Sequence, residues 1–167
     1  MLKIIFVCTG NTCRSPMAEA ILKHKLNNLG VTDVKVSSAG IMAETNSLTS
    51  KNTILALKNM GIVVRAKKAK QLTKSMVTPN TILIPITANH AEYVKNVAKC
   101  ISLNQFASGM DIPDPYGQDL VVYEKCAKIL NFVCDEIADL IKKGELKWFI
   151  WLVTIMVLKR WSLLKIG

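Results

Sequence analysis

Leu2-Lys3-Ile4-Ile5-Phe6-Val7, followed by Cys8-Thr9-Gly10-Asn11-Thr12-Cys13-Arg14-Ser15 and Pro16-Met17-Ala18-Glu19, is the stretch that decides the fold. The first six residues are rich in β-branched and aromatic side chains, which predicts a buried strand. Proline is tolerated at the first position of a helix and a preceding serine can cap it, so we expect a helix to begin at Pro16 with Ser15 as its cap. A tight loop, residues 8–15, must join the two elements.

This loop, called the phosphate loop below, has the composition of an anion site. Successive backbone N–H groups at a helix N-terminus favour a bound anion, and phosphate fits best. The guanidinium of Arg14 offers a planar fork that matches two phosphate oxygens. Cys8 lies at the strand end, where these dipoles and Arg14 stabilise the thiolate over the thiol, so Cys8 is a candidate nucleophile. We expect Gly10 and Asn11 to supply left-handed backbone and Ser15 to donate a hydrogen bond to the sulfur.

Residues 7–19 resemble the signature of the low-molecular-weight protein tyrosine phosphatase family, and the resemblance covers roughly residues 1 to 143. It implies that the loop binds the substrate, through Thr9, Gly10, Asn11, Thr12, Cys13 and Ser15. It also implies that Ser38 helps to brace the loop through Asn11, although a serine there is equally suited to a simple backbone contact. Thr12 resembles the branch of the family that acts on phosphoarginine in proteins, because tyrosine-directed members usually carry a bulky aliphatic residue at this position.

A second stretch, residues 110–117, supplies a candidate acid. Its two prolines fix the backbone and restrict the residue before each of them. The Asp114-Pro115-Tyr116 triplet resembles the family's Asp-Pro-aromatic motif, in which the aspartate is the general acid. Asp111 competes by proximity alone, and either residue is also a common turn former. We expect Tyr116 to be an aromatic wall of the pocket or a loop anchor.

The remaining pattern predicts an α/β fold. Residues 34–38, 81–86 and 100–103 have the character of further strands, and helical spacing of apolar residues follows each strand up to residue 143. Alternating strands and helices form parallel sheets through right-handed crossovers. We therefore expect a three-layer, Rossmann-like sandwich with a central four-stranded parallel sheet. Ligands of such sheets bind at the carboxyl ends of the strands, where Cys8 falls and where residues 41–48 should form one wall of the pocket.

Composition limits the other classes of protein. The chain has 167 residues, and 22 Lys and Arg against 12 Asp and Glu give a net charge of +10, which suits phosphate and other oxyanions. No nucleic-acid motif accompanies this charge, and we expect no metal and no cofactor. The five cysteines are odd in number and widely spaced, and no secretory leader begins the sequence, so we expect a protein of the reducing cytoplasm.

The end of the sequence differs from the rest. We divide the chain into a phosphatase domain, residues 1–144, and a hydrophobic extension, residues 145–167. The run from Trp148 to Leu158 is nearly all apolar, but as a helix its eleven residues reach only roughly 16 Å. A bilayer core is about 30 Å thick, so a spanning helix is disfavoured. Residues 148–167 remain open to two interpretations, an interfacial membrane contact or an accidental extension.

The lead hypothesis is a phosphatase that acts on phosphorylated proteins through a cysteinyl-phosphate intermediate, with phosphoarginine as the expected substrate and phosphotyrosine as the alternative. Arsenate reductases share the loop but need two further redox cysteines in the middle of the chain, and the sequence has none between Cys13 and Cys100. A phosphate-binding or redox-sensing module without turnover is disfavoured, because Cys8, Arg14 and Asp114 are all intact. Oxidation of Cys8 and Cys13 to a reversible disulfide is a further hypothesis.

Overall fold

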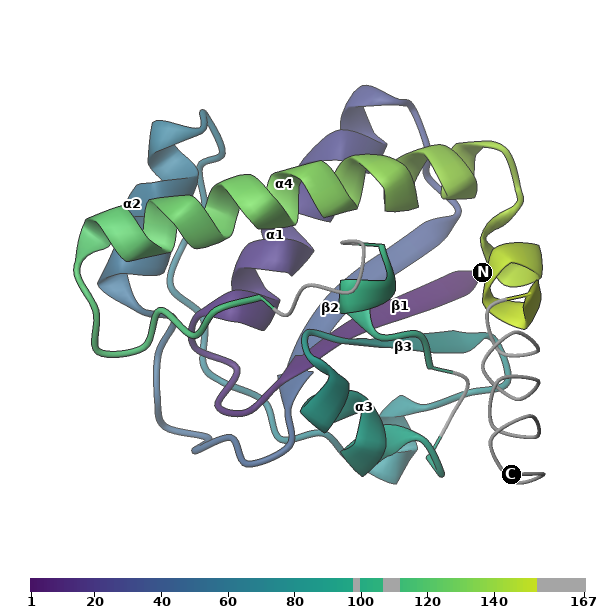
Figure 1. The fold of residues 1–167 in the computed structure, drawn as a ribbon, viewed down its shortest axis with the longest axis horizontal. Helices are drawn as coiled ribbons and strands as arrows, with labels where there is room; N and C mark the ends of the chain where they lie inside the picture. The colour runs from purple at the N-terminus through teal and green to yellow at the C-terminus, as the bar shows by residue number, and fades with distance from the viewer. Residues whose placement is uncertain (98–99, 107–111, 153–167) are drawn as a thin grey trace, which may run out of the picture.

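Strand β1 (Leu2–Cys8) is the centre of a parallel sheet in this computed structural model, which describes residues 1–97, 100–106 and 112–152. It pairs with β2 (Val34–Gly40) on one side and with β3 (Thr81–Pro85) on the other, in the order β2-β1-β3 (Figure 1). The register runs from Leu2 opposite Val34 to Cys8 opposite Gly40. Cys8 therefore lies at the carboxyl end of the middle strand, as expected for a ligand site.

Helices cover both faces of the sheet (Figure 1). Helices α1 (Arg14–Asn28), α2 (Lys51–Asn59) and α4 (Leu120–Lys142) pack against one another on one side. The short α3 (Ala88–Val94) packs against β3 on the other side. Two 3-10 helices, η1 (Lys74–Met76) and η2 (Leu103–Gln105), and a helical segment at residues 146–152 are also part of the described structure. The predicted three-layer α/β arrangement is confirmed.

The side chains of β1 alternate between two hydrophobic cores. Ile4 and Phe6 are fully buried in the larger core, which includes residues of α1 and α4. Ile5 and Val7 are fully buried in a smaller core that includes Val94 of α3. A strand that is buried on both faces needs a continuous apolar run, which explains the absence of polar residues from position 4 to position 7.

The expectation of a four-stranded sheet was wrong for the described part of the chain. Cys100 makes a single parallel bridge to Leu83, and the chain then turns into η2 in place of a strand. The turn places Leu103 and Phe106, three residues apart, in the larger core with exposures of 0% and 4%. This spacing suits a 3-10 turn, whereas an extended strand would not bring both side chains to one side as closely.

The start of α1 also differs from the prediction. The helix begins at Arg14, two residues before Pro16, and Cys13 occupies the N-cap position without a side-chain capping bond. Ser15 is therefore inside the first turn, and its hydroxyl contacts other side chains. The N-cap of α4, in contrast, has a side-chain capping bond, because Asp119 accepts a hydrogen bond from the backbone N–H of Val122 at 3.1 Å.

The proposed boundary at residue 144 stays a prediction, and the structure adds contacts on its far side. Residues 146–152 are helical, and Leu146 and Ile150 join the larger core. The ring of Phe149 stacks on that of Phe106, with centroids 5.2 Å apart. None of the helices among the described residues has the length and hydropathy needed to cross a bilayer. Residues 153–167, which include most of the segment considered for membrane contact, lie outside the described residues.

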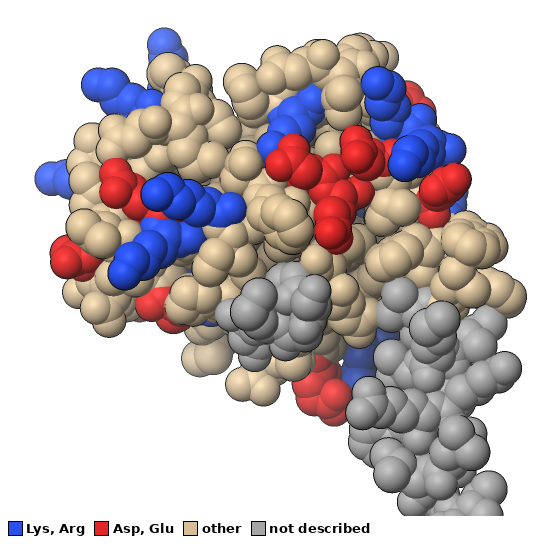
Figure 2. Space-filling view, turned by 45° about the horizontal axis from the view of Figure 1, so that its top comes forward, with Lys and Arg blue, Asp and Glu red and all other residues tan. Residues whose placement is uncertain are grey.

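Charged side chains of both signs lie close together on the face that carries α4 (Figure 2). One such pair joins two helices, because Lys25 of α1 contacts Asp135 of α4 at 2.5 Å. The excess of 10 positive charges is therefore not expressed as a uniform basic surface on this face. A mixed surface of this kind gives little steering to an anion that approaches this face.

Gly40 is the closest point of contact between β2 and the phosphate loop, and it gives a first prediction. A Cβ atom at this position would lie 2.4 Å from the carbonyl oxygen of Thr9 and 3.1 Å from the backbone nitrogen of Asn11. Gly40→Ala must push the loop away from the sheet, so we expect it to lower the free energy of unfolding by about 1–3 kcal/mol. Urea unfolding followed by circular dichroism measures the change.

Gly10→Ala is the matched control within the loop itself. Gly10 was expected to need left-handed backbone, but among the loop residues only Asn11 has a positive φ, at 56°. A Cβ on Gly10 would meet its nearest neighbour, Thr12 Oγ1, at 3.7 Å, which is an ordinary contact. We expect a change below about 0.5 kcal/mol for this variant. Equal losses in the two variants would contradict the steric argument.

Candidate active site

The phosphate loop encloses a pocket of about 260 Å³ at the carboxyl end of β1. The three side chains predicted to be catalytic, those of Cys8, Arg14 and Asp114, all line this pocket. Cys8 and Arg14 lie at the two ends of the same loop, whereas Asp114 comes from the loop before α4, 100 positions after Arg14. The remaining lining residues are Thr9, Gly10, Thr12, Cys13, Met42, Glu44, Ser47 and Tyr116.

The sulfur of Cys8 is surrounded by hydrogen-bonding groups. The backbone N–H of Asn11 donates to Cys8 Sγ at 3.3 Å, and Ser15 Oγ lies 2.9 Å from the same sulfur. Cys8 is 3% exposed, so water gives the sulfur little competing solvation. These contacts fix the position of the sulfur at the pocket, and the thiolate is the form of a cysteine that acts as a nucleophile.

Arg14 and Asp114 form a direct ion pair in the wall of the pocket. The guanidinium Nη2 of Arg14 donates to Asp114 Oδ2 at 2.5 Å, and its side chain is 8% exposed against 52% for that of Asp114. The other carboxylate oxygen, Oδ1, accepts the backbone N–H of Tyr116 at 3.2 Å. The aspartate is therefore oriented on both oxygens, and its exposed position at the mouth lets it exchange protons with a leaving group or with water.

The buried side chain of Asn11 supports the phosphate loop through hydrogen bonds. Its left-handed backbone directs the side chain inward, where Nδ2 donates to Ser15 Oγ and to Ser38 Oγ, both at 2.9 Å. Its Oδ1 accepts the backbone N–H of Lys70 at 2.9 Å, which fixes the orientation of the amide. The contact with Ser38 is the one that the resemblance implied. Asn11 and Ser15 were expected to bind substrate, but their side chains are 1% and 0% exposed and do not line the pocket.

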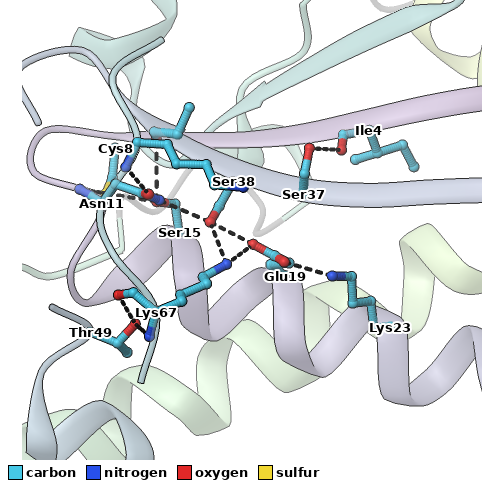
Figure 3. Close-up of polar contacts among 12 residues, drawn as sticks. Ile4, Cys8, Asn11, Ser15, Glu19, Lys23, Ser37, Ser38, Thr49 and Lys67 are labelled. Carbon is cyan, nitrogen blue, oxygen red and sulfur yellow. Dashed lines mark hydrogen bonds and ion pairs between the residues drawn. The ribbon is translucent and has the colours of Figure 1, made fainter. Parts of the chain in front are cut away.

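Beyond Ser38 lies a buried carboxylate, that of Glu19, which pairs with two partly exposed lysines and which the sequence analysis did not identify (Figure 3). Ser38 Oγ donates to Glu19 Oε2 at 2.6 Å, Lys67 Nζ contacts the same oxygen, and Lys23 Nζ contacts Oε1 at 2.7 Å. Burial alone would raise the pKa of Glu19, but the hydrogen bonds from Lys23 and Lys67 outweigh it and hold the pKa below its ordinary 4.5. Glu19 is therefore an anion at neutral pH. The spacing of Glu19 and Lys23 was the only local signal.

The side of the pocket formed by residues 41–48 was predicted in part. Residues 41–48 were expected to form one side of the mouth, and Met42, Glu44 and Ser47 line the pocket. Thr12 and Tyr116 lie at the opening, where Tyr116 is 73% exposed. These side chains are positioned to contact whatever carries the phosphoryl group.

Cys13 shares the pocket with Cys8 but makes different contacts. Its sulfur lies 3.3 Å from the hydroxyl of Tyr123, which also receives a hydrogen bond from Ser50 Oγ at 3.2 Å. Burial, together with Cys13, raises the pKa of Tyr123 to about 12, so this phenol stays protonated. Both cysteines are free thiols in the structure, and the disulfide between them remains a prediction.

Two expectations concern the competing acid Asp111 and a metal site. Asp111, the competing acid, lies outside the described residues. Within the described ranges, no group of three or more His, Cys, Asp or Glu side chains is placed to hold a metal ion.

Comparison with known proteins identifies the family. The sequence model described as "Low molecular weight phosphotyrosine protein phosphatase" matches residues 3–146. The chain belongs to this family. It is 36% identical over 144 residues to a protein-arginine-phosphatase of Geobacillus stearothermophilus, covering 82% of this chain and 94% of the relative. It is 30% identical to a probable low-molecular-weight protein-tyrosine-phosphatase, EpsP, of Ralstonia nicotianae, covering 77% of this chain and 88% of that protein.

A similar solved structure bears on the nucleophile. It is a cysteine-to-serine mutant of the YwlE arginine phosphatase with a phosphorylated active-site serine, and it aligns with a TM-score of 0.77 at 28% identity. The alignment covers 85% of this chain and 97% of that structure. Phosphorylation of a serine that replaces a cysteine is consistent with a cysteine-based mechanism in this family.

The environments of the cysteines predict which one reacts. Burial raises the pKa of Cys126 and of Cys134 to about 12, and both have an exposure of 0%. Cys8 instead faces the pocket, where the backbone N–H of Asn11 donates to its sulfur and the Ser15 hydroxyl lies 2.9 Å from it. We expect iodoacetamide at pH 7 to modify Cys8 at least tenfold faster than Cys126 and Cys134, as read by peptide mass spectrometry.

Cys8→Ser and urea provide the controls. The variant should lose the fast reaction, and urea should make Cys126 and Cys134 reactive. Equal rates for Cys8 and the two α4 cysteines in the folded protein would contradict this interpretation of the pocket.

Proposed function

We propose that this protein is a protein-arginine phosphatase that forms a cysteinyl phosphate on Cys8. The observation that carries the proposal is the convergence of Cys8, Arg14 and Asp114 on one pocket of about 260 Å³. A nucleophile, an oxyanion-binding cation and an acid on one cavity are the parts that phosphoryl transfer to a thiolate requires.

In the first step the Cys8 thiolate attacks phosphorus. The bond from phosphorus to the leaving atom breaks, and the phosphoryl group passes to sulfur. Arg14 and the backbone N–H groups of the loop bind the phosphoryl oxygens. Asp114 donates its proton to the leaving atom, which is a guanidino nitrogen in phosphoarginine. Without that proton a strong base would have to depart, and a positioned acid is worth about 10²–10⁴-fold in rate.

In the second step water hydrolyses the cysteinyl phosphate. Asp114, now a carboxylate, takes a proton from the attacking water, and the bond between phosphorus and Cys8 breaks. Ser15, 2.9 Å from the sulfur, donates to the departing thiolate. Inorganic phosphate leaves, and the thiolate of Cys8 and the protonated Asp114 are restored, so the proton balance closes over the cycle.

The substrate class is supported by Thr12 and by the similarity to the Geobacillus protein. Thr12 lines the pocket, and its Oγ1 lies 3.5 Å from Cys13 Sγ, so the side chain is held at the opening. A hydroxyl at this position leaves more room than a bulky aliphatic side chain, and it can hydrogen-bond to a guanidino group or to water.

The direct test is turnover of paired peptides that carry phosphoarginine or phosphotyrosine in one sequence. We expect phosphate release from the phosphoarginine peptide by the wild type and none by Cys8→Ser. Asp114→Asn should lower kcat by about 10²–10⁴-fold, because the acid is lost while the pocket keeps its shape. Undiminished release by Cys8→Ser would contradict the proposed nucleophile.

A protein tyrosine phosphatase is the second candidate, and Tyr116 favours it. Its ring is 73% exposed at the mouth, where it offers a face to an aromatic substrate. Thr12→Ile decides between the candidates: we expect it to shift the ratio of kcat/KM for phosphoarginine over phosphotyrosine peptides by at least tenfold toward phosphotyrosine. Thr12→Val is the matched control, because it removes the hydroxyl at nearly constant volume. An unchanged ratio in Thr12→Ile would remove the argument from Thr12.

A further inference from the structure

The helical segment at residues 146–152 has two sides of opposite character. Leu146 and Ile150 are buried in the larger core, with exposures of 2% and 6%. Trp148 and Trp151, which are three residues apart and therefore neighbours on a helix surface, have exposures of 60% and 59%. The buried side fixes the rotation of the segment, so the two indole rings are held at the surface of the domain.

Tryptophan is concentrated in this part of the chain. The protein has three tryptophans, at positions 148, 151 and 161, and residues 1–147 contain none. An indole ring is apolar over most of its surface and has one N–H donor, so it suits places where one end of a side chain is apolar and the other is wet. Protein–protein interfaces and the boundary between lipid headgroups and acyl chains are both places of this kind.

The charge of the same region distinguishes between these two partners. Residues 142–167 contain a single acidic residue, Glu145, and six basic residues, which are Lys142, Lys143, Lys147, Lys159, Arg160 and Lys165. Those of the six that the structure describes are all exposed. Lysine is depleted in protein–protein interfaces, whereas it is favourable beside anionic lipid headgroups. Exposed indole rings among lysines therefore favour a lipid surface.

The apolar run of this region is too short to cross a bilayer. As a helix, residues 148–158 would reach roughly 16 Å against a hydrocarbon core of about 30 Å. A short segment with tryptophan on its apolar side and lysine beside it binds in the plane of the interface instead. The family model ends at residue 146, so the run lies beyond the part of the chain that the model matches.

The segment lies at the opposite end of the sheet from the catalytic pocket (Figure 1). Lys147 and Ile150 line a hollow together with Leu2 and Thr81, the first residues of β1 and β3. Cys8 lies at the other end of β1, and a strand of this length spans roughly 20 Å. Contact with a bilayer at this edge therefore does not require the catalytic pocket to be covered.

We propose that Trp148 and Trp151, with the exposed Lys147 beside them, form a membrane-association surface that binds in the plane of an anionic lipid bilayer. The indole rings enter the boundary between headgroups and acyl chains, and the lysine pairs with anionic headgroups. Residues 153–167 add further apolar and basic side chains and no acidic one. This role is independent of the proposed phosphatase activity, because none of its residues lines the catalytic pocket.

The test is flotation of the full-length chain with lipid vesicles. Vesicles of phosphatidylcholine alone are compared with vesicles that also contain phosphatidylserine, and the fraction of protein that floats gives the partition coefficient. We expect at least tenfold tighter binding to the phosphatidylserine vesicles, because each basic residue near an anionic surface contributes about fivefold. Binding should weaken as the salt concentration is raised toward about 1 M, where the Debye length is only about 3 Å.

Tryptophan emission gives a second measurement on the same samples. Because residues 1–147 contain no tryptophan, the emission of the wild type reports on this region alone. Phosphatidylserine vesicles should shift the emission to shorter wavelength, since the rings move from water into the interface. A shift of the same kind that appears without vesicles, as the protein concentration rises, would show that a second copy of the chain covers the rings and would overturn the proposal.

Trp148→Ala/Trp151→Ala removes the two exposed rings and leaves the buried side of the segment intact. We expect this variant to have an at least tenfold lower partition coefficient, because both rings bury apolar area in the interface. Phe132→Ala is the matched control, since Phe132 is 62% exposed but lies on α4, and it should bind like the wild type. Lys147→Gln should bind phosphatidylserine vesicles about fivefold more weakly and phosphatidylcholine vesicles no differently.

Circular dichroism of each variant checks that the fold is retained. Lys147→Gln changes one exposed side chain, so it keeps the test decisive even where the double variant does not fold. Failure of the wild type to float with phosphatidylserine vesicles would overturn the proposal. Equal binding to the two kinds of vesicle, or wild-type binding by a folded Trp148→Ala/Trp151→Ala variant, would overturn it as well.

Discussion

The site depends on the buried side-chain amide of Asn11. The backbone of this residue is left-handed, which an L-amino acid adopts only at a cost, and asparagine carries that cost better than most because its side chain can bond locally. Here the amide uses both N–H groups and its oxygen, on Ser15, Ser38 and the backbone of Lys70. Three separate segments are thereby fixed to one loop residue. The curvature that aims backbone N–H groups into the pocket follows from this brace.

Electrostatic preference for an anion arises locally. Arg14 is buried to 8% side-chain exposure beside the sulfur, where its charge is poorly screened. The nearest carboxylate beneath the loop, that of Glu19, is already compensated by Lys23 and Lys67, so it does not oppose a phosphoryl group in the pocket. On the face that carries α4, charges of both signs are mixed, so this face offers no uniform attraction to an anion (Figure 2).

Sequence reasoning succeeded where the chemistry is local. Residues 2–8 form a strand because an apolar run of this length is suited to burial on two faces, and the loop after it follows from Cys8, Arg14 and the helix start. Sequence reasoning failed where contacts between residues distant in the sequence determine the local structure. Residues 100–103 have the composition of a strand, but filling the core with Leu103 and Phe106 requires a turn. The bond of Lys67 to Glu19 was invisible because nothing in the sequence marks two residues 48 positions apart as neighbours.

The segment that carries Lys67 and Lys70 is attached to the rest of the fold in an unusual way. Isolated bridges, Gly40 with Gln71 and Leu48 with Lys68, hold it in place of a continuous ladder. Short attachments of this kind open at a lower free energy than the core strands do. Opening of this segment breaks the hydrogen bond from the backbone N–H of Lys70 to Asn11 Oδ1, so it removes one support of the phosphate loop while the core strands stay paired. The segment is thus a hinge between local fluctuation and the shape of the anion site.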